Sequence, residues 1–176
     1  MLGEIRDEET AVSAMRAAMT GHLLFTTVHA SGTTGVFDRL TQMGIGSMQL
    51  SSTIHAVLSQ RLCRRLCENC RHEIQLAESH HRQLRLMGIE EAPEGLFFTS
   101  EGCDQCLGKG YTDRLPLFEM LMITDNLRDM IAEGKPAHKI YSEARVEGMQ
   151  TLFDHGLNLA RQGKVSLAEV IRLASS

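Results

Sequence analysis

The chain has 176 residues, 43% of them hydrophobic, and a formal net charge of −4 at pH 7. This length allows one sizeable core with a small appended module, and the mildly acidic balance argues against a protein that binds nucleic acid or anionic membranes through bulk charge. The apolar runs are far shorter than the roughly 20 residues of a membrane-spanning helix, and no signal sequence opens the chain, so we expect a cytoplasmic protein.

The first 66 residues show the alternation of strands and helices that is typical of a parallel α/β sheet. We predict a helix over Glu8–Met19 from the spacing of its apolar residues. His22–His29 is short, apolar and rich in β-branched residues, which predicts a buried strand. Helical periodicity resumes over Val36–Met43, and we predict a further helix over about Gln49–Leu66.

The part of the chain after residue 107 returns to a core-forming pattern. We predict an edge strand over Leu115–Leu121, because Pro116 cannot donate a hydrogen bond to a neighbouring strand. Three helices are expected to follow, at about residues 126–133, 138–147 and 152–162. A last helix begins at Ser166, where Glu169 stands three residues on as in a capping box.

Four of the five cysteines form two Cys-x-x-Cys knuckles between these parts. They are Cys67, Cys70, Cys103 and Cys106. Two intervening residues let both thiolates of a knuckle reach one ion, and two knuckles complete the tetrahedral shell that Zn²⁺ prefers. The long segment between them is a weak objection, because loop-closure entropy grows only logarithmically. An insert with so few apolar residues needs a cross-link to fold, so we predict a structural zinc ion. Four cysteine ligands leave no coordination position for catalysis.

Other interpretations of this segment are a redox dithiol or simple buried thiols. Cys63 lies on a predicted helix and is interpreted as a packed small hydrophobe rather than a fifth ligand. His72, His80 and His81 could replace a cysteine in the shell, although solvated surface is the favoured interpretation. Arginines flank the first knuckle, but no aromatic residue stands near them to stack on bases, so nucleic-acid binding is a minor alternative.

Glu4 and two histidines are candidates for a second site. Glu4 follows an apolar pair and a glycine, where a strand would end, and the carboxyl ends of parallel strands border the ligand crevice. The alternative is an acidic residue at the start of a helix, stabilised by the helix dipole. His22 and His29 bracket a predicted strand of roughly 23 Å, too long for both to touch one small ligand unless the segment bends or a second subunit supplies the site. His29, at the carboxyl end, is the better ligand-facing candidate.

Several of these motifs resemble the secretion ATPase superfamily. Residues 2–7, Leu-Gly-Glu-Ile-Arg-Asp, are similar to its Walker B region, and residues 20–29, Thr-Gly-His-Leu-Leu-Phe-Thr-Thr-Val-His, to its histidine box. The resemblance continues through Arg39-Leu40, Met43-Gly44-Ile45, Gln60-Arg61-Leu62, both knuckles, Gly110-Tyr111, Glu119 and residues 148–152. It is strongest to the C-terminal half of the type II secretion and type IV pilus assembly ATPases, which implies that the chain begins in the middle of a domain.

The resemblance implies an α/β fold in three segments: part of a RecA-like P-loop NTPase core at residues 1–66, the zinc module at 67–106, and a final strand with C-terminal helices at 107–176. It implies a homo-hexamer at the cytoplasmic face of the inner membrane, where ATP hydrolysis with Mg²⁺ acts on the platform and anchoring proteins of a secretion or pilus machine. Glu4 would be the Walker B glutamate, which polarises water or binds Mg²⁺ through its ligands. His22 and His29 would sense or position the γ-phosphate.

The sequence also departs from the family. No Gly-x-x-x-x-Gly-Lys-Ser/Thr loop occurs among the 176 residues, so they hold no phosphate cradle, and the aspartate box and N-terminal domain are missing. Ala30-Ser31 stands where the family has threonine-asparagine, and Asp113 stands where a glycine usually precedes Arg114. Retraction ATPases of the superfamily lack the zinc module, so its presence implies assembly or secretion. We predict an ATPase part that is inactive alone; the alternative is a non-catalytic, zinc-bearing interaction module.

Overall fold

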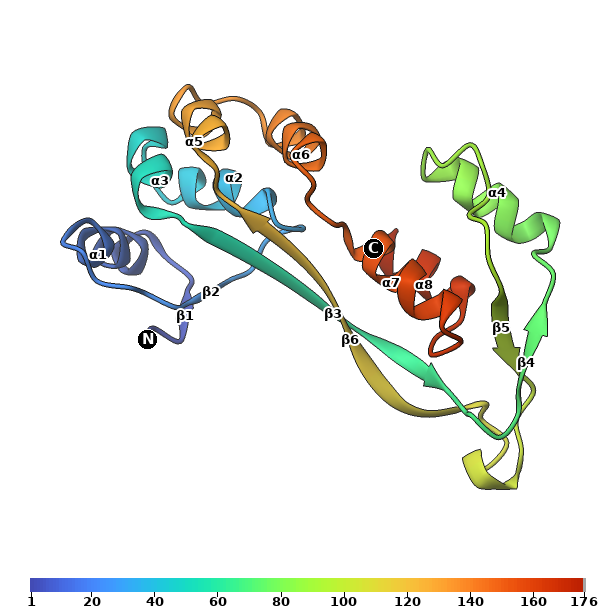
Figure 1. Ribbon diagram of the computed structural model, residues 1–176. Coiled ribbons are helices and arrows are strands. Elements are labelled where there is room, and N and C mark those ends of the chain that lie inside the picture. Colours follow the sequence, from blue (N-terminus) through green and yellow to red (C-terminus); the bar gives the residue numbers. More distant parts are fainter. Residues whose placement is uncertain (176) are drawn as a thin grey trace. The chain divides into compact units, whose positions relative to one another are not determined.

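Two long strands, β3 (Ala56–Leu66) and β6 (Tyr111–Met122), pair with each other and contribute residues to both compact units of the chain (Figure 1). The computed structural model describes residues 1–175. Unit 1 comprises Met1–Ser59 and Met120–Met149. Unit 2 comprises Gln60–Glu119 and the residues from Gln150 to the end of the described chain.

Unit 1 combines a short parallel sheet with five helices. Its elements are β1 (Glu4–Ile5), α1 (Glu8–Met19), β2 (Thr27–Val28), α2 (Gly35–Gln42), α3 (Ser47–Thr53), α5 (Asp125–Ala132) and α6 (Ala137–Val146). In the parallel pair, Glu4 lies opposite Thr27 and Ile5 lies opposite Val28. The core of the unit is apolar, and its fully buried side chains include Ile5, Leu40, Leu50, Leu121, Leu127 and Ile140. Burial of these side chains is the main source of its stability.

Unit 2 is built around an antiparallel pair and three helices. Its elements are β4 (Arg71–Ile74), α4 (Glu78–Leu86), β5 (Phe97–Ser100), the 3₁₀ turn η1 (Asp104–Cys106), α7 (Leu152–Arg161) and α8 (Leu167–Ala174). The register of β4 and β5 runs from Arg71 opposite Ser100 to Ile74 opposite Phe97. A second core includes Cys63, Leu84, Phe97, Leu117, Val165 and Val170.

Side-chain caps explain where several helices begin. Asp7 precedes α1 and its Oδ1 accepts a hydrogen bond of 2.8 Å from the backbone N–H of Thr10, which satisfies a donor that the helix leaves unpaired. This bond also lowers the pKa of Asp7. At α8, Ser166 accepts from the N–H of Glu169 as expected. The Glu169 side chain does not return to complete a capping box; it binds two arginines instead.

The helix predicted over Gln49–Leu66 is wrong for most of its length. The helix α3 ends at Thr53, and β3 begins at Ala56. Along β3 exposure alternates from residue to residue, which is the period of a strand and reflects pairing with β6, remote in sequence. Cys63 therefore lies on a strand. Its interpretation as a packed hydrophobe is confirmed, because its side chain is fully buried in the second core.

The buried strand predicted over His22–His29 is too long, and the prediction that it is buried is also wrong, because Leu23 and Phe25 are 77% and 66% exposed. Only Thr27–Val28 are in a strand, because β1, the partner that they pair with, is equally short. One further hydrogen bond of 2.9 Å, from the N–H of Leu2 to the carbonyl of Phe25, extends the contact. The remaining helices and the strand over Leu115–Leu121 are confirmed to within a few residues.

The two compact units do not follow the three sequence segments. The four-cysteine segment lies inside unit 2, together with α7 and α8 from the end of the chain. The division at residues 67 and 107 stays a prediction about where sequence modules begin. No helix among residues 1–175 is long and apolar enough to cross a bilayer.

Candidate functional site

Glu4 and His29 come together through the parallel pairing of β1 and β2. Glu4 lies opposite Thr27, and His29 follows the end of β2 directly. The expectation that Glu4 stands at the end of a strand is wrong, because Glu4 is the first residue of β1. Their side chains meet: Nε2 of His29 is 2.9 Å from Oε1 of Glu4. The Glu4 side chain is only 18% exposed, whereas that of His29 is 92% exposed, so the imidazole is open to solvent beside a largely buried carboxylate.

Arg6 holds the other oxygen of the same carboxylate. Its Nε and Nη2 atoms both lie 2.6 Å from Oε2 of Glu4. By contrast, Oε1 is buried, and it has no hydrogen-bond partner among the described residues. His29 lies within 2.9 Å of it, but the two groups are not aligned for a hydrogen bond. A carboxylate oxygen with a free lone pair suits a water molecule or a hydrated cation, because both bring donors or positive charge.

His22 does not join this pair. Its Nδ1 lies 3.0 Å from Oγ1 of Thr20, in the turn that follows α1. No hydrogen bond or ion pair between His22 and either Glu4 or His29 occurs in the described chain. Of the two histidines, the structure brings only His29 to Glu4.

The four cysteines predicted as metal ligands converge on one point in unit 2. Their sulfur atoms all lie within 4.8 Å of one another. Neighbouring sulfurs are 3.8 Å apart for Cys67 and Cys103, 3.9 Å for Cys70 and Cys106, and 3.8 Å for Cys103 and Cys106. A tetrahedron with Zn–S bonds of about 2.3 Å requires sulfurs about 3.8 Å apart. The spacing therefore fits Zn²⁺.

Hydrogen bonds to the sulfur atoms lower the pKa of two of the four cysteines, Cys103 and Cys106. The pKa of Cys103 falls to about 6, mainly because the side-chain amide of Asn69 donates to its Sγ over 3.3 Å. Burial opposes ionisation of Cys106, but the backbone N–H groups of Cys103 and Gly110, each 3.2 Å from its Sγ, lower its pKa overall. Desolvation raises the pKa of Cys70 to about 12. A cation is what allows all four thiolates to coexist.

Gly102 allows the tight turn that positions the second Cys-x-x-Cys knuckle. Its φ of +98° is a conformation that residues with a side chain rarely adopt, and a Cβ there would lie 2.4 Å from the carbonyl oxygen of Gly108. The backbone can therefore close tightly around Cys103 only with glycine at this position.

The other titratable residues considered from the sequence lie outside the cluster. His72 faces Glu101 across 3.8 Å, and Nδ1 of His80 accepts a hydrogen bond from the N–H of Ala77. Cys63 is buried in the core, where desolvation raises the pKa of its thiol to about 12. No sequence pattern assigns a role to Arg6 or Asn69. The adjacency of each to a predicted site residue is the signal that could have found them.

Comparison with known proteins places the whole chain in one family. The family model of the type II/IV secretion system protein matches residues 1–172. The type IV pilus assembly ATPase PilB of Thermus thermophilus is 41% identical over 173 residues, which cover 97% of this chain and 19% of that protein. The type II secretion system ATPase E of Vibrio cholerae is 36% identical over 175 residues, covering 98% of this chain and 34% of that one.

The fold also matches a solved structure. The Legionella pneumophila ATPase DotB superimposes with a TM-score of 0.64 over 99% of this chain and 38% of that chain, at 22% identity. This likeness confirms the predicted fold class, an α/β fold that matches part of the DotB structure. The four-cysteine cluster that was predicted with it is present in this chain. The chain spans about a third or less of the length of the relatives described above. With the match over residues 1–172, the chain belongs to the type II/IV secretion system protein family.

Proposed function

We propose that this chain supplies the water-activating carboxylate and a structural zinc module to a cytoplasmic ATPase that drives type II secretion or type IV pilus assembly. The observation that carries the proposal is the 2.9 Å contact between His29, which directly follows β2, and Glu4, the first residue of the parallel strand β1. Ligands of open parallel sheets bind beyond the carboxyl ends of the strands, where His29 lies. The proposed assembly is a homo-hexamer that acts on inner-membrane platform and anchoring proteins.

The geometry suggests a division of labour around Glu4. Arg6 fixes Oε2, which leaves Oε1 to orient a water molecule or a water ligand of Mg²⁺. His29, exposed on the solvent side, would position the γ-phosphate, and His22 would contribute from the turn after α1. ATP with Mg²⁺, held by a phosphate-binding loop of the complete protein, would supply the phosphoryl group. Such a reaction needs positioning and charge stabilisation more than covalent catalysis.

In the proposed function, the four-cysteine cluster has a structural role. Four sulfurs fill the shell of Zn²⁺ and leave no position for a substrate. Zinc would tie the segment around Cys67 to that around Cys103, in addition to the pairing of β4 with β5 and the hydrogen bond from Asn69 to Cys103.

The test is a comparison of variants in the complete ATPase. Glu4→Gln should lower kcat by about 10²-fold or more, while the Kd for ATP changes little, because the carboxylate acts on water rather than on the nucleotide. Glu9→Gln, which removes an exposed carboxylate from α1, is the matched control. A loss of nucleotide affinity in proportion to turnover would contradict the role proposed for Glu4.

A second candidate is a non-catalytic, zinc-bearing interaction module. It is favoured by one observation, the lack of a Gly-x-x-x-x-Gly-Lys-Ser/Thr loop within these 176 residues. The discriminating experiment mixes this chain with a P-loop-bearing partner from the same cell. Stable association with no gain in ATP hydrolysis would favour the interaction module, and restored hydrolysis would favour the ATPase.

A further inference from the structure

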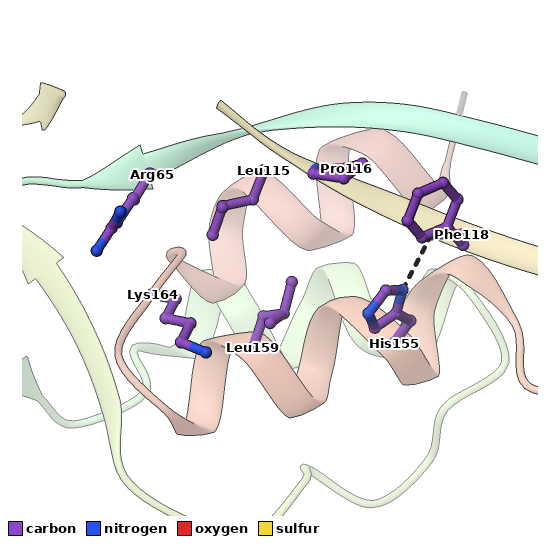
Figure 2. Close-up of a pocket in the computed structure, with 7 residues that line it drawn as sticks. All are labelled: Arg65, Leu115, Pro116, Phe118, His155, Leu159 and Lys164. Atoms are coloured by element: carbon purple, nitrogen blue, oxygen red, sulfur yellow. Dashed lines mark hydrogen bonds between the residues drawn. The ribbon is translucent and has the colours of Figure 1, made fainter. Parts of the chain in front are cut away.

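A hollow of about 390 Å³ opens in unit 2, and none of the residues that line it belongs to either candidate site (Figure 2). Leu115, Pro116 and Phe118 of β6 form one wall, and Leu159 of α7 lies across from them. Because Pro116 has no N–H, this stretch of the strand presents apolar surface with one backbone donor fewer. We name this feature the β6–α7 hollow.

His155 gives the hollow a directed hydrogen-bond donor. Its Nδ1 accepts a bond of 3.0 Å from the backbone N–H of Phe118, and the two rings stack with centroids 6.0 Å apart. A backbone N–H can only donate, so Nδ1 carries no hydrogen and the ring hydrogen is on Nε2. The imidazole is thereby held in one tautomer and one orientation, with Nε2–H available to a ligand.

Two cations complete the lining. Lys164 lies on the turn between α7 and α8, and Arg65 lies on β3. The backbone of Lys164 is fixed on both sides, because its carbonyl accepts from Leu66 over 2.9 Å and its N–H donates to Leu159 over 3.0 Å. The Arg65 side chain is paired with Glu68 and is 37% exposed.

No acidic side chain is among those that line the hollow, and no ion pair of Lys164 occurs within residues 1–175. Because Arg65 is paired with Glu68, the positive charge of the hollow lies mainly at Lys164, and its walls are apolar. This combination complements a carboxylate attached to an apolar body. The imidazole of His155 is preorganised by its bond to Phe118, which reduces the entropy cost of binding.

We propose that the β6–α7 hollow binds a segment of a partner protein in which an acidic residue stands next to a large apolar one. The carboxylate pairs with Lys164 and with Nε2–H of His155, and the apolar side chain packs on Leu159. A protein segment is favoured over a metabolite because Phe118 is 38% exposed, so the hollow is open. Small-molecule sites usually enclose about 70–90% of their ligand. A partner surface would close the opening, because the core of a protein interface is buried and enriched in aromatic residues and arginine.

The experiment titrates the full isotopically labelled chain, prepared with Zn²⁺, with two matched peptide pools and follows its NMR spectrum. The acidic pool contains acetylated, amidated tetrapeptides with Glu or Asp next to Leu or Phe, and the neutral pool carries Gln or Asn instead. We expect the acidic pool to shift the signals of the His155 ring and of Leu159, and the neutral pool to do so much less. Lys164→Gln should weaken binding of the acidic pool about threefold to fivefold, which is the effect expected from the loss of one partly exposed ion pair.

Lys139→Gln is the control, because it removes the same charge from an exposed position in unit 1. Equal binding of both pools, unchanged His155 signals, or an equal effect of the two lysine variants would overturn the proposal. Displacement of the acidic pool by an equal concentration of inorganic phosphate would also overturn it, and would assign the hollow to a small anion.

Discussion

Arg64 and Glu169 form a two-pronged ion pair that joins β3 to α8 across 105 residues of sequence. Nε of Arg64 lies 3.0 Å from Oε1 of Glu169, and Nη2 lies 2.8 Å from Oε2. Arg172 binds the same carboxylate, and the guanidinium of Arg64 lies 4.2 Å from the centroid of the Tyr111 ring. Both carboxylate oxygens are thereby satisfied, although the Glu169 side chain is 2% exposed.

This arrangement predicts an acid-sensitive contribution to stability. The bond to Arg64, opposed by desolvation and supported by Arg172, lowers the pKa of Glu169 from 4.5 to about 2. A lowered folded-state pKa stabilises the fold above pH 4.5 and the effect disappears as the pH falls towards 2. Because both guanidiniums are half exposed and screened by water, we expect Glu169→Gln to cost on the order of 2 kcal/mol at pH 7.

Urea unfolding of the wild type and of Glu169→Gln, between pH 7 and pH 2, measures this contribution. The difference in unfolding free energy should shrink as the pH falls below 4.5. Glu90→Gln, at an exposed position on the surface, is the control and should differ little from wild type at any pH. A difference between wild type and Glu169→Gln that stays constant with pH would show that the charge of Glu169 is not its source.

The zinc assignment predicts that Cys63 can be replaced without loss of the metal, whereas a cysteine of the cluster cannot. Cys106→Ala removes a sulfur from the cluster, whereas Cys63→Ala removes a buried sulfur outside it. We expect one Zn²⁺ per chain in wild type and Cys63→Ala, and much less in Cys106→Ala, by metal analysis after dialysis. Structural zinc contributes roughly 10 kcal/mol in small domains, so a chelator should lower the Tm of the first two proteins. Equal zinc content in both variants would refute the four-sulfur site.

Local chemistry was predictable from the sequence, but pairing between distant segments was not. The spacing of the knuckles predicted the metal cluster, since two residues fix each sulfur pair whatever the rest of the fold does. The helix expected over Gln49–Leu66 failed because β3 is stabilised by β6, which lies far along the chain. Glu169 was interpreted as a capping residue because its partner Arg64 is equally remote.

The site residues show the same limit. Glu4 and His29 were singled out by strand ends and by family resemblance, yet only the parallel register of β1 and β2 shows that they touch. The β6–α7 hollow had no signal in the sequence. Its cations, its imidazole and its apolar wall come from separate segments that carry no shared motif.

The geometry around Glu4 predicts that the two histidines differ in importance. In the complete ATPase, His29→Asn should lower kcat by about 10²-fold, because it removes the group beside the free carboxylate oxygen. His22→Asn should lower kcat less, since His22 contacts Thr20 and not Glu4. Steady-state ATP hydrolysis over a range of ATP concentrations separates kcat from KM. Equal losses of kcat would mean that His22 moves to the site when nucleotide binds.

A close helix contact in unit 2 makes Gly156 sensitive to a single methyl group. Alanine usually stabilises a helix relative to glycine by about 0.5–1 kcal/mol. Here, a Cβ on Gly156 would lie 2.5 Å from Cγ1 of Val170 and 3.3 Å from Cδ1 of Leu117, so α7 and α8 would have to separate. We therefore expect Gly156→Ala to destabilise the protein by about 1–3 kcal/mol, the usual cost of overpacking a core.

A double-mutant cycle tests this mechanism. Val170→Ala alone leaves a cavity and should also be destabilising, but it removes the atoms that the new methyl group would strike. Urea unfolding of the four proteins should therefore give a double variant more stable than the sum of the single effects, by about 1 kcal/mol or more. Strict additivity would mean that the helices accommodate the methyl group elsewhere, and that the contact between Gly156 and Val170 does not set the spacing of α7 and α8.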